Sequence, residues 1–317
     1  MTHQPIYLGT TDEKVNPRDP FIFYLGGFYY HLYAKYEKLW IKKSETIENL
    51  CEAEPVLIWD EDDPQCSQEV WAPELHVIDG ICYIYVALDD GNNFNHRMYC
   101  LTNHSGDPLK KFTNLGLVEG CDEFWSIDGT ILCYNHQKYF VWSGWDCKEN
   151  VIQKIFIQKM ENPRKLAGKP IEISKPELDW EKRGCEGKND HPFINEGPAA
   201  IYGNTHLHLC YSASGSWSDD YCLGLLTFSG GDILDKNAWV KSEKPLMERG
   251  KKALGPGHAS FIQNSPNGKF YFAYHLFNED YKGGWMATHA VIDTFEMADD
   301  YPVLPPAVNL FKERVKA

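Results

Sequence analysis

Three carboxylates stand at the same distance from a turn in three separate parts of the chain. Asp19, Asp128 and Glu196 each lie seven residues before a pair of turn-forming residues, and each is followed at once by proline or glycine. Carboxyl groups that are brought together raise one another's pKa, because each negative charge disfavours the next. Carboxyl groups with separated pKa values supply the acid and the base of glycoside hydrolysis. A single aspartate at a strand start is more often a turn or cap residue, so the shared spacing is the informative feature.

The elements that must hold these carboxylates form a fivefold repeat. Each copy has a short apolar strand, a turn and an aromatic-rich strand, and the copies cover residues 19–34, 73–87, 128–142, 196–211 and 258–274. Tight hairpins between the two strands are favoured by turn-forming pairs, namely Gly26-Gly27, Asp79-Gly80, Asn135-His136, Gly203-Asn204 and Asn267-Gly268. The interval between copies fits a four-stranded propeller blade with long loops.

Five such units predict an all-β fold, a five-bladed β-propeller that occupies residues 1–317 as a single domain. A β-sandwich is the alternative, and it does not explain a repeat of this regularity. The innermost strands of a propeller begin at one end of its central channel. We therefore expect Asp19, Asp128 and Glu196 to converge on one axial pocket, with Glu74 and His258 contributed by the other two repeats.

Composition restricts the ligand class. The chain has 31 Lys and Arg against 45 Asp and Glu, a formal net charge of −14, which disfavours a nucleic-acid partner. No apolar run is long enough for a membrane-spanning helix, so no membrane partner is expected. Aromatic residues make up 14% of the chain, a content that suits both β-sheets and sugar-binding clefts.

The expected compartment follows from the N-terminus and the cysteines. Residues 1–9 lack the features of a signal peptide, and the 10 cysteines include no CxxC pair. Several cysteines lie within apolar strand-like runs, as small hydrophobic residues do. The prediction is a cytoplasmic protein with mostly reduced cysteines, although an exported protein produced without its signal has the same features. Homo-oligomerisation is left open.

Five motifs, in order along the chain, resemble glycoside hydrolase family forty-three, a family of inverting five-bladed-propeller glycosidases. They are RDPFI at 18–22, WAPELH at 71–76, IDGT at 127–130, NEGP at 195–198 and GPGHASF at 255–261. Three further segments look like the exo-acting α-L-arabinofuranosidase subgroup, namely 89–98, 139–145 and 221–227. Motifs of other hydrolases and of nucleotide-binding proteins are lacking.

The resemblance implies a role for each carboxylate. Asp19 would be the general base that activates water, and Glu196 the general acid that protonates the leaving oxygen. Asp128 would orient Glu196 and raise its pKa. Phe21, Trp71 and Trp145 would line the sugar pocket, with packing between blades as the alternative for Trp71.

His258 matches a family histidine that faces the central channel. The resemblance implies that it contacts substrate and helps to hold a calcium ion together with water, and a purely structural histidine is the alternative. Two departures from the family pattern predict an altered sugar subsite: Ala259 stands where relatives often have asparagine, and residues 284–292 lack an expected arginine.

The implied function is the inverting release of terminal α-L-arabinofuranose from arabinan or arabino-oligosaccharides. Without a visible signal peptide, imported arabino-oligosaccharides are favoured over cell-wall polymer as the substrate. A β-xylosidase on the same scaffold is the alternative within enzymes. A non-catalytic glycan-binding propeller is the alternative from another class, and the presence of all three carboxylates argues against it.

Overall fold

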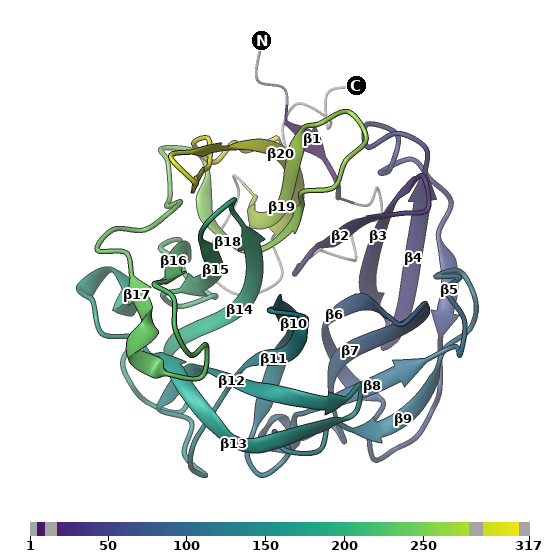
Figure 1. Ribbon diagram of the computed structural model, residues 1–317, viewed down its shortest axis with the longest axis horizontal. Helices are drawn as coiled ribbons and strands as arrows, with labels where there is room; N and C mark the ends of the chain where they lie inside the picture. Colours follow the sequence, from purple (N-terminus) through teal and green to yellow (C-terminus); the bar gives the residue numbers. More distant parts are fainter. Residues whose placement is uncertain (1–4, 10–17, 279–287, 311–317) are drawn as a thin grey trace.

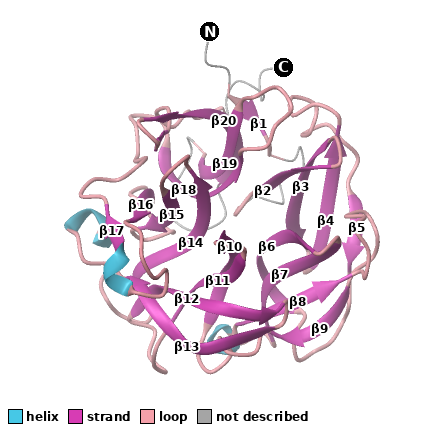
Figure 2. Cartoon of the chain, in the orientation of Figure 1, coloured by secondary structure: helices cyan, strands magenta, loops and turns pink. Residues whose placement is uncertain are grey.

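The computed structural model describes residues 5–9, 18–278 and 288–310 of the chain. Its strands form blades arranged in a ring, with the first strand of each blade nearest the centre (Figure 1). Strands make up almost all of the regular structure (Figure 2). The helices of this described part are short 3₁₀ turns at Asn93–Asn95, Asp179–Lys182 and Lys236–Ala238. None of them is long and apolar enough to cross a membrane.

Each blade is an antiparallel sheet that runs outward from the centre. Blade one contains β2 (Phe21–Leu25), β3 (Phe28–Lys35), β4 (Lys38–Ser44) and β5 (Val56–Trp59). Blade two contains β6 (Gln68–Ile78), β7 (Ile81–Asp89), β8 (Arg97–Thr102) and β9 (Thr113–Leu117). Blade three contains β10 (Ser126–Tyr134), β11 (Gln137–Gly144), β12 (Ile152–Asn162) and β13 (Lys165–Ser174).

Blade four contains β14 (Phe193–Tyr202), β15 (Leu207–Ala213), β16 (Cys222–Phe228) and β17 (Trp239–Lys241). A short parallel pairing between β12 and β14 joins blades three and four into one continuous sheet. Blade five contains β18 (Leu254–Ile262), β19 (Phe270–Phe277) and β20 (Thr288–Ala298). Two short strands, β1 (Ile6–Tyr7) and β21 (Tyr301–Val303), pair with opposite ends of β20.

The ring is closed by strands from the two ends of the described chain. β1 adds to blade five, so the strand that precedes blade one completes the last blade (Figure 1). Buried apolar side chains form five clusters, and each cluster fills the space between two neighbouring blades. The cluster between blades five and one includes Leu8, Ile22 and Ile292. Burial of these apolar faces is the main force that holds the blades together.

The predicted hairpins form at the predicted turns in the first three blades. Gly26-Gly27, Asp79-Gly80 and Asn135-His136 each have positive φ at both positions, which is the backbone of a two-residue type I′ turn. In blade four the paired strands end at Tyr202 and Leu207, and in blade five at Ile262 and Tyr271. These two turns are therefore longer than the predicted pairs Gly203-Asn204 and Asn267-Gly268. Of the segment 284–292, where the sequence lacks the expected arginine, residues 284–287 lie outside the described ranges.

Candidate active site

A residue with a left-handed backbone lies at an equivalent position in, or just before, every innermost strand. These residues are Asp19 (φ 50°), Ala72 (φ 43°), Asp128 (φ 55°), Gly197 (φ 56°) and His258 (φ 49°). In β6, β10, β14 and β18 the pairing register shifts at this point. Such irregularities turn a side chain away from the regular alternation of a strand. Three of these residues, Asp19, Ala72 and His258, line the pocket described below.

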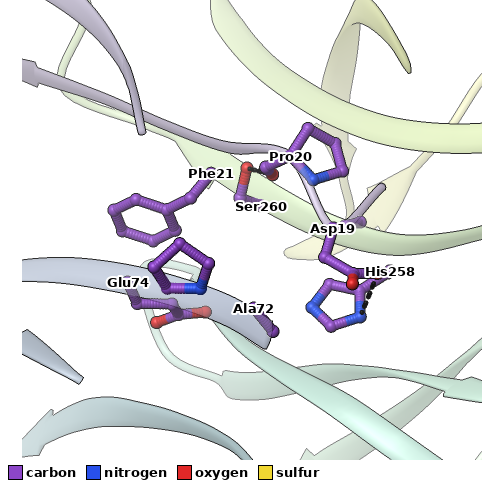
Figure 3. A pocket seen from close by; sticks show the side chains of 9 residues that line it. Asp19, Pro20, Phe21, Ala72, Glu74, His258 and Ser260 are labelled. Atoms are coloured by element: carbon purple, nitrogen blue, oxygen red, sulfur yellow. Dashed lines mark hydrogen bonds and ion pairs between the residues drawn. The ribbon is translucent and has the colours of Figure 1, made fainter. Parts of the chain in front are cut away.

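Asp19 lies just before β2 and faces two histidines of blade five. Its Oδ1 is 3.0 Å from Nδ1 of His258 (Figure 3). Its backbone N–H donates to Nδ1 of His275, at 3.2 Å. Burial lowers the pKa of His275 well below its usual value, so this ring is neutral and accepts through Nδ1. The Asp19 side chain is 23% exposed, which leaves one face of the carboxylate open to water.

Asp128 lies in β10 and is tied to the strand that carries Glu196. The backbone N–H of Gly197 donates to Asp128 Oδ2 at 2.9 Å. Burial raises the pKa of Asp128 well above its usual value, and the negative charges of Glu196 and Asp19 raise it further. Asp128 thus holds the backbone next to Glu196 and is close enough to Glu196 for the two charges to repel each other.

Glu196 lies in β14 and is 7% exposed. Burial raises the pKa of its carboxyl group to about 7, and the charge of Asp19 contributes to the rise. A hydrogen bond from Tyr221 and the positive charge of Arg18 act in the opposite direction on this pKa. Of the causes that raise the pKa of Glu196, burial is the largest and the charge of Asp19 is the next. The repulsion between Glu196 and Asp128 raises the pKa of Asp128, and the effect of Asp128 on Glu196 stays a prediction. A carboxyl group with a pKa near 7 keeps its proton in neutral solution often enough to act as a general acid.

The three predicted carboxylates are therefore brought to one place. Gly197 lies between Asp128 and His258. Its N–H donates to Asp128, and a Cβ added at Gly197 would lie 3.2 Å from His258 Nδ1. His258 in turn contacts Asp19. Glu74 also belongs to this group, since its charge raises the pKa of Asp128.

A small pocket opens between the starts of blades one, two and five (Figure 3). It is lined by Asp19, Pro20, Phe21, Ala72, Pro73, Glu74, His258, Ala259 and Ser260. Glu74 Oε2 lies within hydrogen-bond distance of His76, 2.9 Å from its Nε2. Phe21 and His258 thus lie where the sequence predicted, at the pocket wall, and their contact with a sugar remains a prediction.

The two predicted tryptophans have different surroundings. Trp71 is half-buried and stacks on the ring of His96, with the centroids 4.0 Å apart. Trp145 is 5% exposed, stacks on Trp125 at 4.8 Å and belongs to the cluster between blades two and three. The position of Trp145 indicates a packing role, whereas Trp71 keeps an accessible surface.

Tyr221, Ser212 and His275 are site residues that the sequence did not single out as such. Tyr221 donates to Glu196 Oε1 at 2.8 Å, and the Ser212 hydroxyl accepts from the backbone N–H of His258 at 2.8 Å. Tyr221 is the first residue of the segment 221–227, which resembles the arabinofuranosidase subgroup, and this resemblance could have marked it as a site residue. Nothing local distinguishes Ser212 or His275 from other strand residues.

The described side chains do not by themselves fit a calcium ion. Within residues 5–9, 18–278 and 288–310, no group of three or more His, Cys, Asp or Glu side chains is placed to hold a metal. Calcium takes six to eight oxygen ligands, and a histidine offers only ring nitrogens. Of the two ring nitrogens of His258, Nδ1 already contacts Asp19. The calcium ion stays a prediction, and no step below depends on it.

A ring of β-sheet blades with three carboxyl groups clustered at its innermost strands is an arrangement that suits a glycosidase. The chain belongs to the family described as "Glycosyl hydrolases family 43", whose sequence profile matches residues 14–302. This match confirms the family that the five motifs indicated.

The individual relatives include several arabinofuranosidases. The chain is 33% identical over 257 residues to "Alpha-L-arabinofuranosidase 43" of Humicola insolens, a match that covers 78% of this chain and 52% of that protein. It is 32% identical over 266 residues to an extracellular exo-α-(1→5)-L-arabinofuranosidase of Streptomyces avermitilis, covering 81% and 54%. The chain thus spans about half the length of these two curated relatives.

Among solved structures, an α-L-arabinofuranosidase from Lactobacillus brevis is similar over nearly the whole chain. It superposes with a TM-score of 0.84 at 31% identity, covering 95% of this chain and 97% of that one. This similarity confirms the five-bladed propeller predicted from the repeat.

Proposed function

We propose that this glycosidase releases terminal α-L-arabinofuranose from arabinan or arabino-oligosaccharides, with inversion at the anomeric carbon. The observation that carries the proposal is the contrast between Glu196, which is buried with a pKa of about 7, and Asp19, which is open to water beside His258. The activities for which the relatives at about one-third identity are named support the choice of arabinofuranose.

Each carboxylate has one task in the proposed reaction. Asp19 accepts a proton from a water molecule, and that water attacks the anomeric carbon from the face opposite the leaving group. Glu196 donates its proton to the leaving oxygen as the glycosidic bond breaks. Asp128 holds the backbone of Gly197 and so keeps Glu196 in place.

The pocket walls supply the proposed sugar contacts. Phe21 and His258 line the pocket beside Asp19. Trp71 presents a flat ring backed by His96, which suits contact with an apolar sugar face. An arabino-oligosaccharide is the proposed partner of this surface.

Parallel hydrolysis of two chromogenic substrates tests the proposal. We expect release of 4-nitrophenol from 4-nitrophenyl α-L-arabinofuranoside and little release from 4-nitrophenyl β-D-xylopyranoside. Proton NMR early in the reaction should show a first-formed arabinose of inverted configuration.

Three outcomes contradict the proposal in different ways. Faster cleavage of the xyloside assigns the site to β-xylosidase activity. Cleavage of neither substrate, together with binding of arabino-oligosaccharide, indicates a glycan-binding propeller. A retained configuration makes one carboxylate a nucleophile and removes the water-activating role from Asp19.

A further inference from the structure

Tyr221 is a fully buried tyrosine in direct contact with the proposed acid. It directly precedes β16, and its hydroxyl donates to Glu196 Oε1 at 2.8 Å. Burial raises the pKa of Tyr221 well above its usual value, so the phenol keeps its proton and acts as a donor. The reaction proposed above assigns no task to this residue.

The ring of Tyr221 is held on two sides. A Cβ at Gly257 would overlap the Tyr221 ring, so the glycine lets the backbone of β18 lie against it. On another side the ring stacks on His275, with centroids 5.6 Å apart and planes at 18°. His275 also accepts the backbone N–H of Asp19, so one buried ring pair contacts both proposed catalytic residues.

The hydrogen bond restricts where Glu196 can carry its proton. A protonated carboxyl group has one hydroxyl oxygen and one carbonyl oxygen. Since Tyr221 donates to Oε1, that oxygen serves as the acceptor, and the acidic proton is placed on Oε2. We propose that Tyr221 is a positioning residue that selects Oε2 of Glu196 as the proton-donating oxygen. This inference rests on the proposed acid role of Glu196.

A second consequence concerns how readily the proton is given up. A donor on Oε1 favours the ionised carboxylate, so Tyr221 opposes the rise in the pKa of Glu196 that burial causes. Charged or titratable groups around Glu196 come from several elements: Asp19 and Arg18 before β2, Asp128 in β10, and Cys185 in the segment before β14. The Tyr221→Phe substitution leaves all of them in place and removes only the hydroxyl.

The test compares wild type with Tyr221→Phe on α-1,5-L-arabinobiose and 4-nitrophenyl α-L-arabinofuranoside. We expect kcat on arabinobiose to fall about tenfold, in keeping with the loss of one hydrogen bond of this kind. The loss on the aryl substrate should be much smaller, because its leaving group barely needs a proton. The basic limb of the kcat/KM profile should move to higher pH by roughly half to one unit.

Tyr85→Phe is the matched control. Tyr85 is equally buried, and its hydroxyl donates at 2.7 Å to the backbone carbonyl of Pro163 rather than to Glu196. This variant reports the general cost of losing a buried tyrosine hydroxyl and should leave the basic limb unmoved. An equal displacement in both variants, or an unmoved limb in Tyr221→Phe, would overturn the inference.

An infrared measurement separates this inference from the proposed activity. In pH-difference spectra, the C=O stretching band of protonated Glu196 is assigned by its loss in Glu196→Gln. That band should move to higher wavenumber in Tyr221→Phe, because Oε1 has lost its donor. If wild type cleaves no arabinoside, the proposed function fails while the band still decides the role of Tyr221. A band that stays in place refutes that role whatever substrate the enzyme cleaves.

Discussion

Glu196 and Asp19 have the same functional group but different surroundings. Glu196 is buried, accepts from a tyrosine and has a pKa raised to about 7. Asp19 is partly open to water and faces the imidazole of His258. The first setting suits a proton donor, and the second suits a group that accepts a proton from water.

Removing each carboxylate should separate the two roles. Glu196→Ala should lose about 10²–10⁴-fold in kcat on arabinobiose but retain much more activity on an activated aryl arabinofuranoside, because a good leaving group needs little protonation. Asp19→Ala should be poor on both substrates, since water must be activated in either case. Steady-state kinetics measure these losses. Glu161→Ala, which alters a carboxylate paired with Lys165 at the surface, is the control. Equal losses of Glu196→Ala on both substrates would contradict the acid role.

The raised pKa of Glu196 also makes a prediction about stability. The folded protein holds this proton up to about pH 7, whereas an unfolded glutamate releases it near 4.5, so the folded state binds more protons between these values. Stability should therefore fall as pH rises from 4.5 to 7, by about 3 kcal/mol from this group alone. Denaturant unfolding at several pH values should show a shallower fall in Glu196→Gln. An identical pH dependence in the two proteins would argue against a proton held by Glu196.

The innermost strands place the site through a repeated local feature. Each has a left-handed residue within it or just before it, and in β14 that residue is Gly197 rather than Glu196. Gly197 lies six residues before the turn at Gly203, whereas Asp19 and Asp128 lie seven residues before theirs. The offset puts the N–H of Gly197 against Asp128 and leaves Glu196 beside Tyr221.

Gly197→Ala tests this feature of β14. The new Cβ would lie 3.2 Å from His258 Nδ1, on a backbone with φ of +56°, so both strain and displacement are expected. The free energy of unfolding should fall by about 1–2 kcal/mol, and kcat by about 10- to 100-fold.

Gly268→Ala is the control for strain alone. Gly268 has φ of +72°, and a Cβ there would meet nothing within 4 Å. It should lose similar stability and keep full activity. A Gly197→Ala enzyme with normal kcat would show that the Asp128–Gly197–His258 contact does not position the acid.

The ring as a whole depends on the strand that precedes blade one. Leu8 follows β1, is fully buried between blades five and one, and donates its N–H to Ala290 O at 2.8 Å. Without this closure, the interface between the first and last blades loses part of its apolar contact.

Leu8→Ala should therefore destabilise the whole propeller. The expected loss is about 2–5 kcal/mol in the free energy of unfolding, the usual range for a fully buried leucine. Urea unfolding measures it. Leu115→Ala, at a position 37% exposed, should change the stability by less than about 1 kcal/mol. Equal effects of the two changes would mean that the closure contributes little.

Local chemistry was enough to predict the hairpins of the first three blades, the number of blades and the three carboxylates. Turn pairs such as Asp79-Gly80 act over a few residues, and the repeat places equivalent strands at equivalent distances from the axis. The motifs around Asp19, Asp128 and Glu196 are contiguous in sequence, so they are visible without coordinates.

Contacts between side chains of different blades could not be predicted from local sequence. Asp19 hydrogen-bonds to His275, which is 256 positions away in the sequence. The hydroxyl of Tyr221 contacts Glu196 because the Tyr221 ring packs between Gly257, which has no side chain to block it, and His275. The burial that raises the pKa of Glu196 is likewise a property of the closed ring. Trp145 resembles a sugar-binding tryptophan in sequence, yet packing against Trp125 buries it. Such features depend on which distant side chains share a space, and blade packing sets that arrangement in three dimensions.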